Sequence, residues 1–395
     1  MTAIAPADES QLAAAIAEAA AARTPLAVEG GGTRRGLGRP TQTAATLSTA
    51  AISGVTLYEP TELVISARAG TPLDEVETLL AGNRQRLAFE PLDHRPLLHS
   101  SGTPTIGAAA AANLSGSRRI QAGAARDSLI GLRAVNGRGE VIKSGGRVMK
   151  NVTGYDLVKF LSGSYGTLAV FSEVTFKVVP VPETEATLVL TGLDDEAAVK
   201  ALSVALTSPW SVTGAAHLPA MDQAPARTLI RIDGFEPSVR ERTGKLAGAL
   251  AAFGAIEPLP ETDAAALWQA VRDGTVFNPL KRAVIWRISV RPGDGPRLVA
   301  ELRRALPCRV FYDWGGGLVW VAATDTGDSA GALVVRDAVA LVGGHATLVR
   351  APDDVRVAVE VFEPQPAPVM DLTRRIKATF DPEGILNPGR MYAGV

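Results

Sequence analysis

A glycine-rich loop that follows a predicted strand is the first part of this sequence whose residue types could do chemistry. The loop reads G-G-G-T-R-R-G from Gly30 to Gly36. Consecutive glycines let backbone N–H groups approach a phosphate closely and form an anion-binding nest, and Arg34 or Arg35 would add positive charge. A flexible loop without a ligand is the alternative, and the segment alone does not decide between the two.

This loop differs from the common nucleotide-binding motifs. The G-x-G-x-x-G fingerprint fails because position 35 is Arg, and the sequence contains no G-x-x-x-x-G-K-[ST] loop. Classical nicotinamide-binding and ATP-binding folds are therefore disfavoured.

A second candidate segment, residues 105–119, combines small residues with polar ones. It reads T-I-G-A-A-A-A-A-N-L-S-G-S-R-R. The small side chains leave room for a planar ligand against the backbone, and Asn113 and Ser115 could donate hydrogen bonds to a pyrophosphate or a ring carbonyl. Arg118, Arg119 and Arg126 bring positive charge. A tightly packed alanine helix is the alternative reading.

The third candidate segment, residues 145–157, reads G-G-R-V-M-K-N-V-T-G-Y-D-L. Lysine, asparagine, tyrosine and aspartate within one short loop-to-helix segment are more typical of a site than of a core. A solvated loop is the alternative. The segment leads to G-S-Y-G-T-L at residues 163–168.

Short predicted elements position these segments in the first 180 residues. We expect a helix at 9–22, strands at 26–29, 55–58 and 63–69, and a helix that begins near Pro72. Asn136-Gly137-Arg138-Gly139 predicts a hairpin between strands 131–135 and 140–143, and a long strand follows at 168–179. Pro180 and Pro182 then mark the best domain boundary.

Beyond residue 182, predicted strands and helices alternate with comparable weight. This pattern predicts an α+β domain with an antiparallel sheet, and a duplicated split βαβ arrangement would fit it. We expect domains at 1–181 and 182–378, followed by a turn-rich tail at 379–395 that packs back on the first domain.

Composition excludes several classes of function. The 395 residues are 46% hydrophobic with a net charge of −1, which gives no overall electrostatic case for a nucleic-acid binder. The single cysteine, Cys308, allows no internal disulfide and no four-thiolate cluster, and the four histidines have no metal-binding spacing, so we expect no metal site. With no secretory signal and no apolar run of about 20 residues, we expect a cytoplasmic protein without a transmembrane segment.

Six motifs in order carry a resemblance to a known family: P-L-A-V-E-G-G-G-T, T-E-L-V-I-S-A-R-A-G-T, T-I-G-A-A-A-A-A-N-L-S-G, K-N-V-T-G-Y-D-L, G-S-Y-G-T-L and E-V-T-F-K-V-V-P. Together they resemble the FAD-binding domain of the vanillyl-alcohol-oxidase/p-cresol methylhydroxylase (PCMH) class. The tail F-D-P-E-G-I-L-N-P-G-R resembles the C-terminal signature of FAD-linked oxidases. Within the class, D-W-G-G at 313–316, G-G-H-A-T-L and N-P-G-R-M-Y are most similar to the FAD-binding subunits of bacterial glycolate oxidases.

The resemblance implies a PCMH-type FAD-binding domain of two subdomains, followed by an α+β cap domain for substrate or subunit interaction. It implies FAD contacts by Gly30, Gly31, Gly32, Thr33, Arg34, Gly36, Gly70, Thr105, Gly107, Asn113, Gly116, Gly123, Gly166, Val174 and Asn387. Residues 30–36 would hold the pyrophosphate and Val174 would contact the adenine side. Lys150 and Tyr155 would lie near the flavin, where a cation could stabilise the reduced ring. Because residues 30–36 include no histidine, we expect FAD to be bound non-covalently.

The cap offers few candidates for catalysis. Arg287 or Arg291 could hold a substrate carboxylate, and His345 could act as a lone general base, although a buried structural histidine is the competing reading.

The resemblance implies a subunit that supports oxidation of glycolate, a 2-hydroxyacid, to glyoxylate and passes electrons to a second FAD-binding subunit and an iron–sulfur subunit. It also allows peripheral association with the inner face of the cell membrane through those partners. A self-sufficient FAD-dependent 2-hydroxyacid dehydrogenase and a scaffold subunit with a vestigial flavin site are the alternatives.

Overall fold

The chain divides into two compact units in a computed structural model that describes residues 2–146, 154–222 and 224–395. Unit 1 comprises residues 1–115, 122–181 and 364–395, and unit 2 comprises residues 116–121 and 182–363. Lys150, which the family resemblance predicts to lie near the flavin, is outside the described residues.

Unit 1 begins with a small parallel sheet of order β1-β3-β2, formed by β1 (Thr2–Ile4), β3 (Ala45–Ser48) and β2 (Leu26–Glu29). Helix α1 (Glu9–Ala21) packs on this sheet through Leu12 and Ile16, which are fully buried in its core. The side chain of Asp8 caps the helix by accepting a hydrogen bond from the Gln11 amide at 2.8 Å. The predicted helix at 9–22 and strand at 26–29 are confirmed as α1 and β2.

The larger sheet of unit 1 has the order β4-β5-β9-β7-β8, with β6 (Gln85–Leu87) paired to β9. Its strands are β4 (Val55–Glu59), β5 (Val64–Arg68), β9 (Ala169–Pro180), β7 (Leu129–Asn136) and β8 (Val141–Gly145), and neighbouring strands are antiparallel. The predicted hairpin at Asn136–Gly139 joins β7 to β8, as expected.

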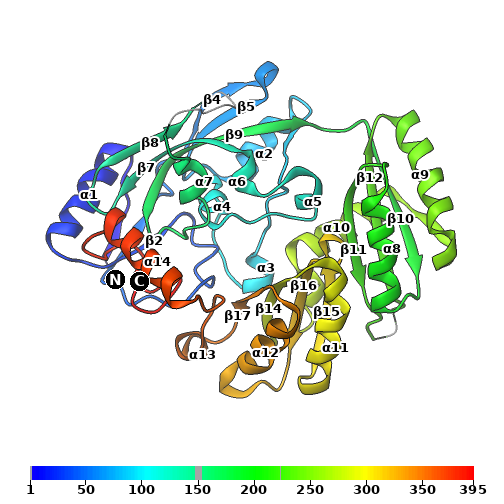
Figure 1. Cartoon of the computed structure of the whole chain (residues 1–395). Helices are drawn as coiled ribbons and strands as arrows, with labels where there is room; N and C mark the ends of the chain where they lie inside the picture. The colour runs from blue at the N-terminus through cyan, green and yellow to red at the C-terminus, as the bar shows by residue number, and fades with distance from the viewer. Residues whose placement is uncertain (1, 147–153, 223) are drawn as a thin grey trace. The chain divides into compact units, whose positions relative to one another are not determined.

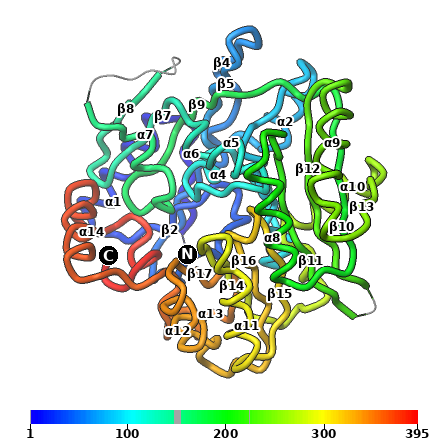
Figure 2. Tube along the Cα trace, turned by 45° about the vertical axis from the view of Figure 1, so that its right-hand side comes forward, coloured from blue at the N-terminus to red at the C-terminus, as the bar shows by residue number. Residues whose placement is uncertain are grey.

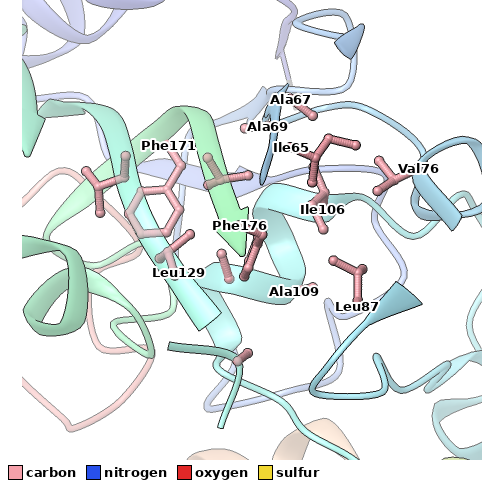
Figure 3. Close-up of a cluster of buried hydrophobic side chains, with 14 of the residues drawn as sticks. Ile65, Ala67, Ala69, Val76, Leu87, Ile106, Ala109, Leu129, Phe171 and Phe176 are labelled. Carbon is pink, nitrogen blue, oxygen red and sulfur yellow. The ribbon is translucent and has the colours of Figure 1, made fainter. Parts of the chain in front are cut away.

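One hydrophobic core fills the space between this sheet and two helices, α2 (Leu73–Ala81) and α4 (Ile106–Ala112). Figure 3 shows Ile65, Phe171 and Phe176 of the sheet with Ile106 and Ala109 of α4. The alanine-rich stretch at 106–112 is thus a packed helix, and its small side chains bring the helix backbone close to β5 and β9.

Unit 2 is built around an eight-stranded sheet of order β13-β10-β12-β11-β15-β16-β14-β17 (Figure 1). The strands are β10 (Thr184–Thr191), β11 (Val212–Leu218), β12 (Arg227–Gly234), β13 (Ile256–Leu259), β14 (Val284–Ser289), β15 (Cys308–Asp313), β16 (Leu318–Ala323) and β17 (His345–Arg350). All pairings are antiparallel. Each half has the chain order βαββαβ, so the predicted α+β class and duplicated split βαβ arrangement are confirmed.

Different helices pack on the two faces of the unit 2 sheet. Helices α8 (Asp195–Thr207) and α9 (Glu236–Leu250) pack on the first half, and α11 (Gly295–Ala305) and α12 (Ala332–Val342) pack on the second. Helix α10 (Glu261–Asp273) joins the halves, and its Trp268 donates a hydrogen bond to Thr187 Oγ1 at 2.9 Å. Because Thr187 alternates with Leu188, which faces α8 and α9, Trp268 lies on the opposite face.

The remaining short helices are α3 (Arg95–Leu98), α5 (Arg119–Ala122), α6 (Ala125–Ser128), α7 (Leu157–Leu161) and α13 (Asp353–Ala358). The last helix, α14 (Ala367–Phe380), belongs to unit 1. The chain passes from unit 1 to unit 2 after Val181, and its last segment of unit 1 begins at Pro364. Among the described residues, no helix combines the length and the apolar character needed to span a bilayer.

Candidate functional site

The glycine loop at the end of β2 packs closely against residues 102–105, with Gly31 against the Thr103 backbone and Gly30 against the Thr105 side chain. A Cβ built on Gly31 would lie 1.9 Å from the Thr103 carbonyl oxygen, and one on Gly30 would lie 2.3 Å from Thr105 Oγ1. Real Cβ atoms do not approach other atoms this closely, so both positions require glycine. The loop is therefore a built feature and not a loose connection, which was the competing reading of the sequence.

Arg34 places a guanidinium inside unit 1 beside this loop. The residue is 9% exposed, and its Nη2 donates to the Leu92 carbonyl at 3.0 Å. In the part of the chain that the structure describes, Nε and Nη1 are buried without a hydrogen-bond partner. Burial lowers the pKa of Arg34 to about 10, and the charge of Asp93 opposes this shift, so the side chain remains a cation at neutral pH.

Two hydroxyl groups of unit 1 are also buried without a hydrogen-bond partner in the described part of the chain. Thr105 Oγ1 and Ser164 Oγ are buried, and neither has a hydrogen-bond partner within residues 2–146, 154–222 and 224–395. Buried polar atoms are normally paired, and each exception calls for an explanation. Thr105 Oγ1 lies against Gly30 of the same loop that carries Arg34, so an anionic ligand rich in acceptor oxygens at this loop would satisfy the donors of both residues.

The other glycines of the predicted cofactor site hold elements in close contact. A Cβ on Gly107 of α4 would lie 2.5 Å from the Cβ of Ala69, and one on Gly70 would lie 2.1 Å from the Thr49 carbonyl oxygen. Gly36, Gly32 and Thr33 lie in the loop itself, where Gly32 has φ +79° and Thr33 is buried. The glycines at 70 and 107 therefore set the spacing of the backbone around residues 69–71.

Asn113 ends α4 with φ +50°, and its Oδ1 accepts a hydrogen bond from the Arg126 amide at 3.0 Å. Ser115 Oγ similarly accepts from the Ala125 amide at 2.8 Å. Gly123, with φ +80°, lies between these two anchor points in sequence. The polar side chains expected to face a dinucleotide thus tie the two ends of segment 113–126 together.

Three further residues of the predicted cofactor site, Gly116, Tyr155 and Val174, differ in their surroundings. Gly116 belongs to unit 2, together with Arg118 and Arg119. Tyr155 is 92% exposed, and Val174 is 1% exposed within the hydrophobic core of unit 1. Tyr155 thus lies at the surface of unit 1, and the Val174 side chain packs in its core.

In unit 2 the structure brings Arg287 and His345 to one face of the sheet. Strand β14 pairs with β17 so that Arg287 lies opposite Thr347 and Ser289 opposite His345. Since residues 345 and 347 share a face, His345 lies on the same side as Arg287. By contrast Arg291 is an exposed residue paired with Asp294 at 2.6 Å.

A tryptophan and a second arginine complete this cluster. The guanidinium carbon of Arg287 lies 4.9 Å from the ring centroid of Trp314, and that of Arg119 lies 4.7 Å from the same ring. These are cation–π distances. The sequence predicts only that Arg119 adds positive charge to segment 105–119, whereas the structure places its guanidinium against the same tryptophan ring as that of Arg287.

Hydrogen bonds fix Trp314 in an unusual backbone conformation with φ +52°. The buried Asp313 carboxylate accepts from the Trp314 amide at 2.7 Å and from Ser117 Oγ at 2.7 Å. The indole Nε1 of Trp314 donates to the Gly116 carbonyl at 3.1 Å. A positive φ at tryptophan costs about 1–3 kcal/mol and persists only where the surroundings determine it.

The cluster changes the proton affinity of His345. Partial desolvation and then the positive charge of Arg287 lower the pKa of His345, while the carboxylate of Glu363 opposes the shift; Arg119 and Arg336 lower it further. The imidazole is therefore neutral at neutral pH and able to accept a proton. No group of three or more metal-ligating His, Cys, Asp or Glu side chains occurs among the described residues.

Comparisons with known proteins agree with this geometry. Residues 2–145 match the family described as FAD binding domain, and residues 365–391 match FAD linked oxidases, C-terminal domain. The chain is 34% identical over 371 residues to glycolate oxidase subunit GlcE of Escherichia coli (strain K12), a match that covers 94% of this chain and 93% of that protein. It is 27% identical over 332 residues to glycolate oxidase subunit GlcD of Bacillus subtilis (strain 168), covering 73% of this chain and 68% of that protein.

A solved structure shares the fold at low sequence identity. Substrate-bound p-cresol methylhydroxylase matches with a TM-score of 0.74 and 14% identity, over 99% of this chain and 88% of that one. The PCMH-type fold expected from the sequence is confirmed. The chain is an FAD-dependent oxidoreductase of the FAD-linked oxidases, and it belongs to the family of glycolate oxidase subunit GlcE.

Proposed function

We propose that this chain is the FAD-binding subunit of a multi-subunit glycolate oxidase that supports oxidation of glycolate to glyoxylate. Its partners would be a second FAD-binding subunit and an iron–sulfur subunit. The observation that carries the proposal is that Arg34 of the glycine loop and Thr105 beside Gly30 have buried donors without a hydrogen-bond partner among the described residues. The similarity to glycolate oxidase subunits GlcE and GlcD supports the substrate and the multi-subunit assembly.

The described residues fit the pyrophosphate of FAD. The backbone of Gly30–Gly32 would approach the phosphates, and Arg34 would supply a charge in a site where little water screens it. Thr105 Oγ1 and Ser164 Oγ would donate to cofactor oxygens. The bound flavin would supply the electron acceptor for removal of a hydride equivalent from a 2-hydroxyacid.

FAD would be held non-covalently because residues 30–36 include no histidine. The single Cys308 implies that iron–sulfur clusters lie in a partner, to which this subunit would pass electrons. We place the complex in the cytoplasm or at the inner face of the membrane through its partners. The proposed positions of Lys150 and Tyr155 near the flavin rest on the sequence motif alone.

The test is the visible spectrum of the purified chain before and after anaerobic addition of glycolate. We expect a bound flavin that stays oxidised in the isolated chain and bleaches when the partner subunits are present. A colourless protein that fails to rebind added FAD would contradict the proposal and leave the scaffold alternative.

The arginine cluster of unit 2 favours a second candidate, a self-sufficient FAD-dependent 2-hydroxyacid dehydrogenase. Arg287 would pair with the substrate carboxylate, and the neutral His345 would accept the hydroxyl proton. In that case glycolate would bleach the flavin of the isolated chain. Arg287→Met would abolish the bleaching without removing the flavin, while Arg304→Met, at an exposed site on α11, would leave it unchanged.

A further inference from the structure

We propose that the C-terminal segment of unit 1 positions the glycine loop from both ends and is thereby part of the cofactor-binding machinery. We call the four residues that do this, Lys377, Asp381, Asn387 and Arg390, the tail clamp. The inference rests on the proposed assignment of residues 30–36 to the FAD pyrophosphate. Figure 2 shows β2 and α14 near the C-terminus, as does Figure 1.

Asn387 holds the strand that enters the loop. The backbone of the tail forms a parallel bridge between Leu386 and Leu26 of β2, with the Asn387 amide donating to the Leu26 carbonyl at 3.0 Å. The Asn387 side chain then pairs with Val28 as a further strand residue would: Oδ1 accepts from the Val28 amide at 2.8 Å, and Nδ2 donates to its carbonyl at 3.3 Å. Val28 lies two residues before Gly30.

The Asn387 side chain has its donors engaged within the protein. Besides its contact with Val28, Nδ2 donates to the Tyr165 carbonyl at 2.8 Å. Gly166, with φ +71°, follows directly, and a Cβ there would lie 3.0 Å from Nδ2. Both amide hydrogens are therefore used, so Asn387 is a positioning residue for the cofactor and not a ligand, which revises its role in the sequence-based site.

Arg390 holds the other end of the loop. Its Nη2 donates to the carbonyls of Arg34 at 3.0 Å and of Arg35 at 3.3 Å. Its own carbonyl accepts from the Arg39 amide at 2.8 Å. The guanidinium thus acts on the backbone that carries the buried Arg34 side chain.

Lys377 and Asp381 fix the clamp to the body of unit 1. The Asp381 carboxylate accepts from the amides of Ile385 at 3.1 Å and Leu386 at 2.8 Å. Lys377 Nζ donates to Asp381 Oδ2 and to the carbonyls of Leu386 and Thr167, each at 2.7 Å. All three ammonium hydrogens are used, which compensates for the burial that lowers the pKa of Lys377.

If the tail clamp positions the loop, a substitution in the clamp should weaken the binding of ligands that carry phosphates and spare ligands that lack them. A ligand that contacts the loop benefits from a pre-organised backbone, whereas a ligand without phosphates does not. ADP and adenosine, which differ by the two phosphates, are therefore the probes, and FAD binding is measured beside them on the apoprotein of the full chain.

Arg390→Met is the main variant, because the residue lies near the surface and its loss should leave the fold intact. We expect the affinity for ADP and FAD to fall about tenfold while the affinity for adenosine changes less than about twofold. Arg390→Lys should restore part of the loss. Asn387→Asp, which keeps the acceptor for Val28 but loses both donors, should behave like Arg390→Met.

Glu383→Gln is the matched control, since Glu383 lies on the same tail but forms its ion pair with the exposed Arg23, at 2.8 Å, and not with the loop. We expect no change in any of the three affinities. Equal losses for ADP and adenosine, or no loss for either, would overturn the clamp. A wild-type chain that binds ADP no better than adenosine would instead overturn the assignment of the loop to the pyrophosphate, and the clamp with it.

Discussion

Arg34 and Arg35 show how two adjacent identical residues acquire different roles. Arg35 is exposed and forms an ion pair with Glu29 of β2. Arg34 is buried with two nitrogens unpaired in the described part of the chain. A buried guanidinium without full pairing destabilises the apoprotein, and the cost is recovered when a ligand supplies the missing acceptors.

Arg34→Met should therefore separate stability from cofactor affinity. We expect the Tm of the apoprotein to stay the same or rise, because an incompletely paired charge is replaced by an apolar side chain. FAD affinity should fall about ten- to a hundredfold, as expected for loss of charge-assisted hydrogen bonds of about 1.5–3 kcal/mol. Thermal unfolding of the apoprotein and FAD titration measure the two effects.

Arg35→Met is the control for this comparison. Loss of an exposed ion pair should change stability by less than about 1 kcal/mol and leave FAD affinity nearly constant. Equal effects of the two substitutions on FAD affinity would contradict the role of Arg34.

The sequence could locate the loop but could not distinguish these arginines. Glycine spacing after a strand is a local signal, whereas the burial of Arg34 depends on Leu92 and on segments far away in the chain. Asn387 illustrates the same limit, because its motif marked it as functional but only the structure shows that it binds Val28 and Tyr165.

At the scale of elements, the packing of α4 depends on Gly107. Alanine is a better helix former than glycine by about 1 kcal/mol, so propensity alone predicts that Gly107→Ala stabilises the chain. The contact with Ala69 reverses this sign, because the new Cβ would lie 2.5 Å from another Cβ.

We expect Gly107→Ala to lower the free energy of unfolding by about 1–3 kcal/mol, the usual cost of overpacking. Chemical denaturation of the apoprotein measures this loss. Gly244→Ala on α9, where a Cβ meets no atom within 4 Å, should stabilise the chain instead. A stabilising Gly107→Ala would show that α4 can move away from β5.

Element types followed from periodicity and turn residues in most of the chain, including the Asn136–Gly139 hairpin. Strand β11 carries little strand signal in the sequence, because Val212–Leu218 contains Gly214, two alanines and His217, none of which is typical of a strand. Its seven residues are all buried, so its position in the middle of the sheet and not its own propensity makes it a strand.

At the scale of the whole molecule, the six residues 116–121 belong to unit 2 although both flanking segments belong to unit 1. Arg118 anchors them: its side chain is 3% exposed and pairs with Asp233 and, at 3.2 Å, with Glu185. No periodicity in the sequence could show that residues 116–121 belong to unit 2, because this depends on partners of Arg118 that lie 67 and 115 residues away.

Arg118→Met should destabilise unit 2 by about 3–5 kcal/mol, because two partly buried carboxylates each lose an ion pair. All five tryptophans of the sequence, at 210, 268, 286, 314 and 320, lie in this unit, so urea unfolding followed by tryptophan fluorescence reports on it directly. Arg240→Met, which removes the exposed pair with Glu236, should shift the midpoint little. Similar midpoints for the two variants would show that the anchor contributes little.

The pairing of Val28 with Asn387 also sets an order of events during synthesis. The two residues are 359 positions apart. Because ribosomes add about 5–20 residues per second, Asn387 is synthesised about 20–70 s after Val28. Every residue of unit 2 is made before the tail that completes unit 1. A nascent chain should therefore acquire its flavin only at the end of translation, and an interrupted chain that lacks the tail would not draw on the cellular supply of the cofactor.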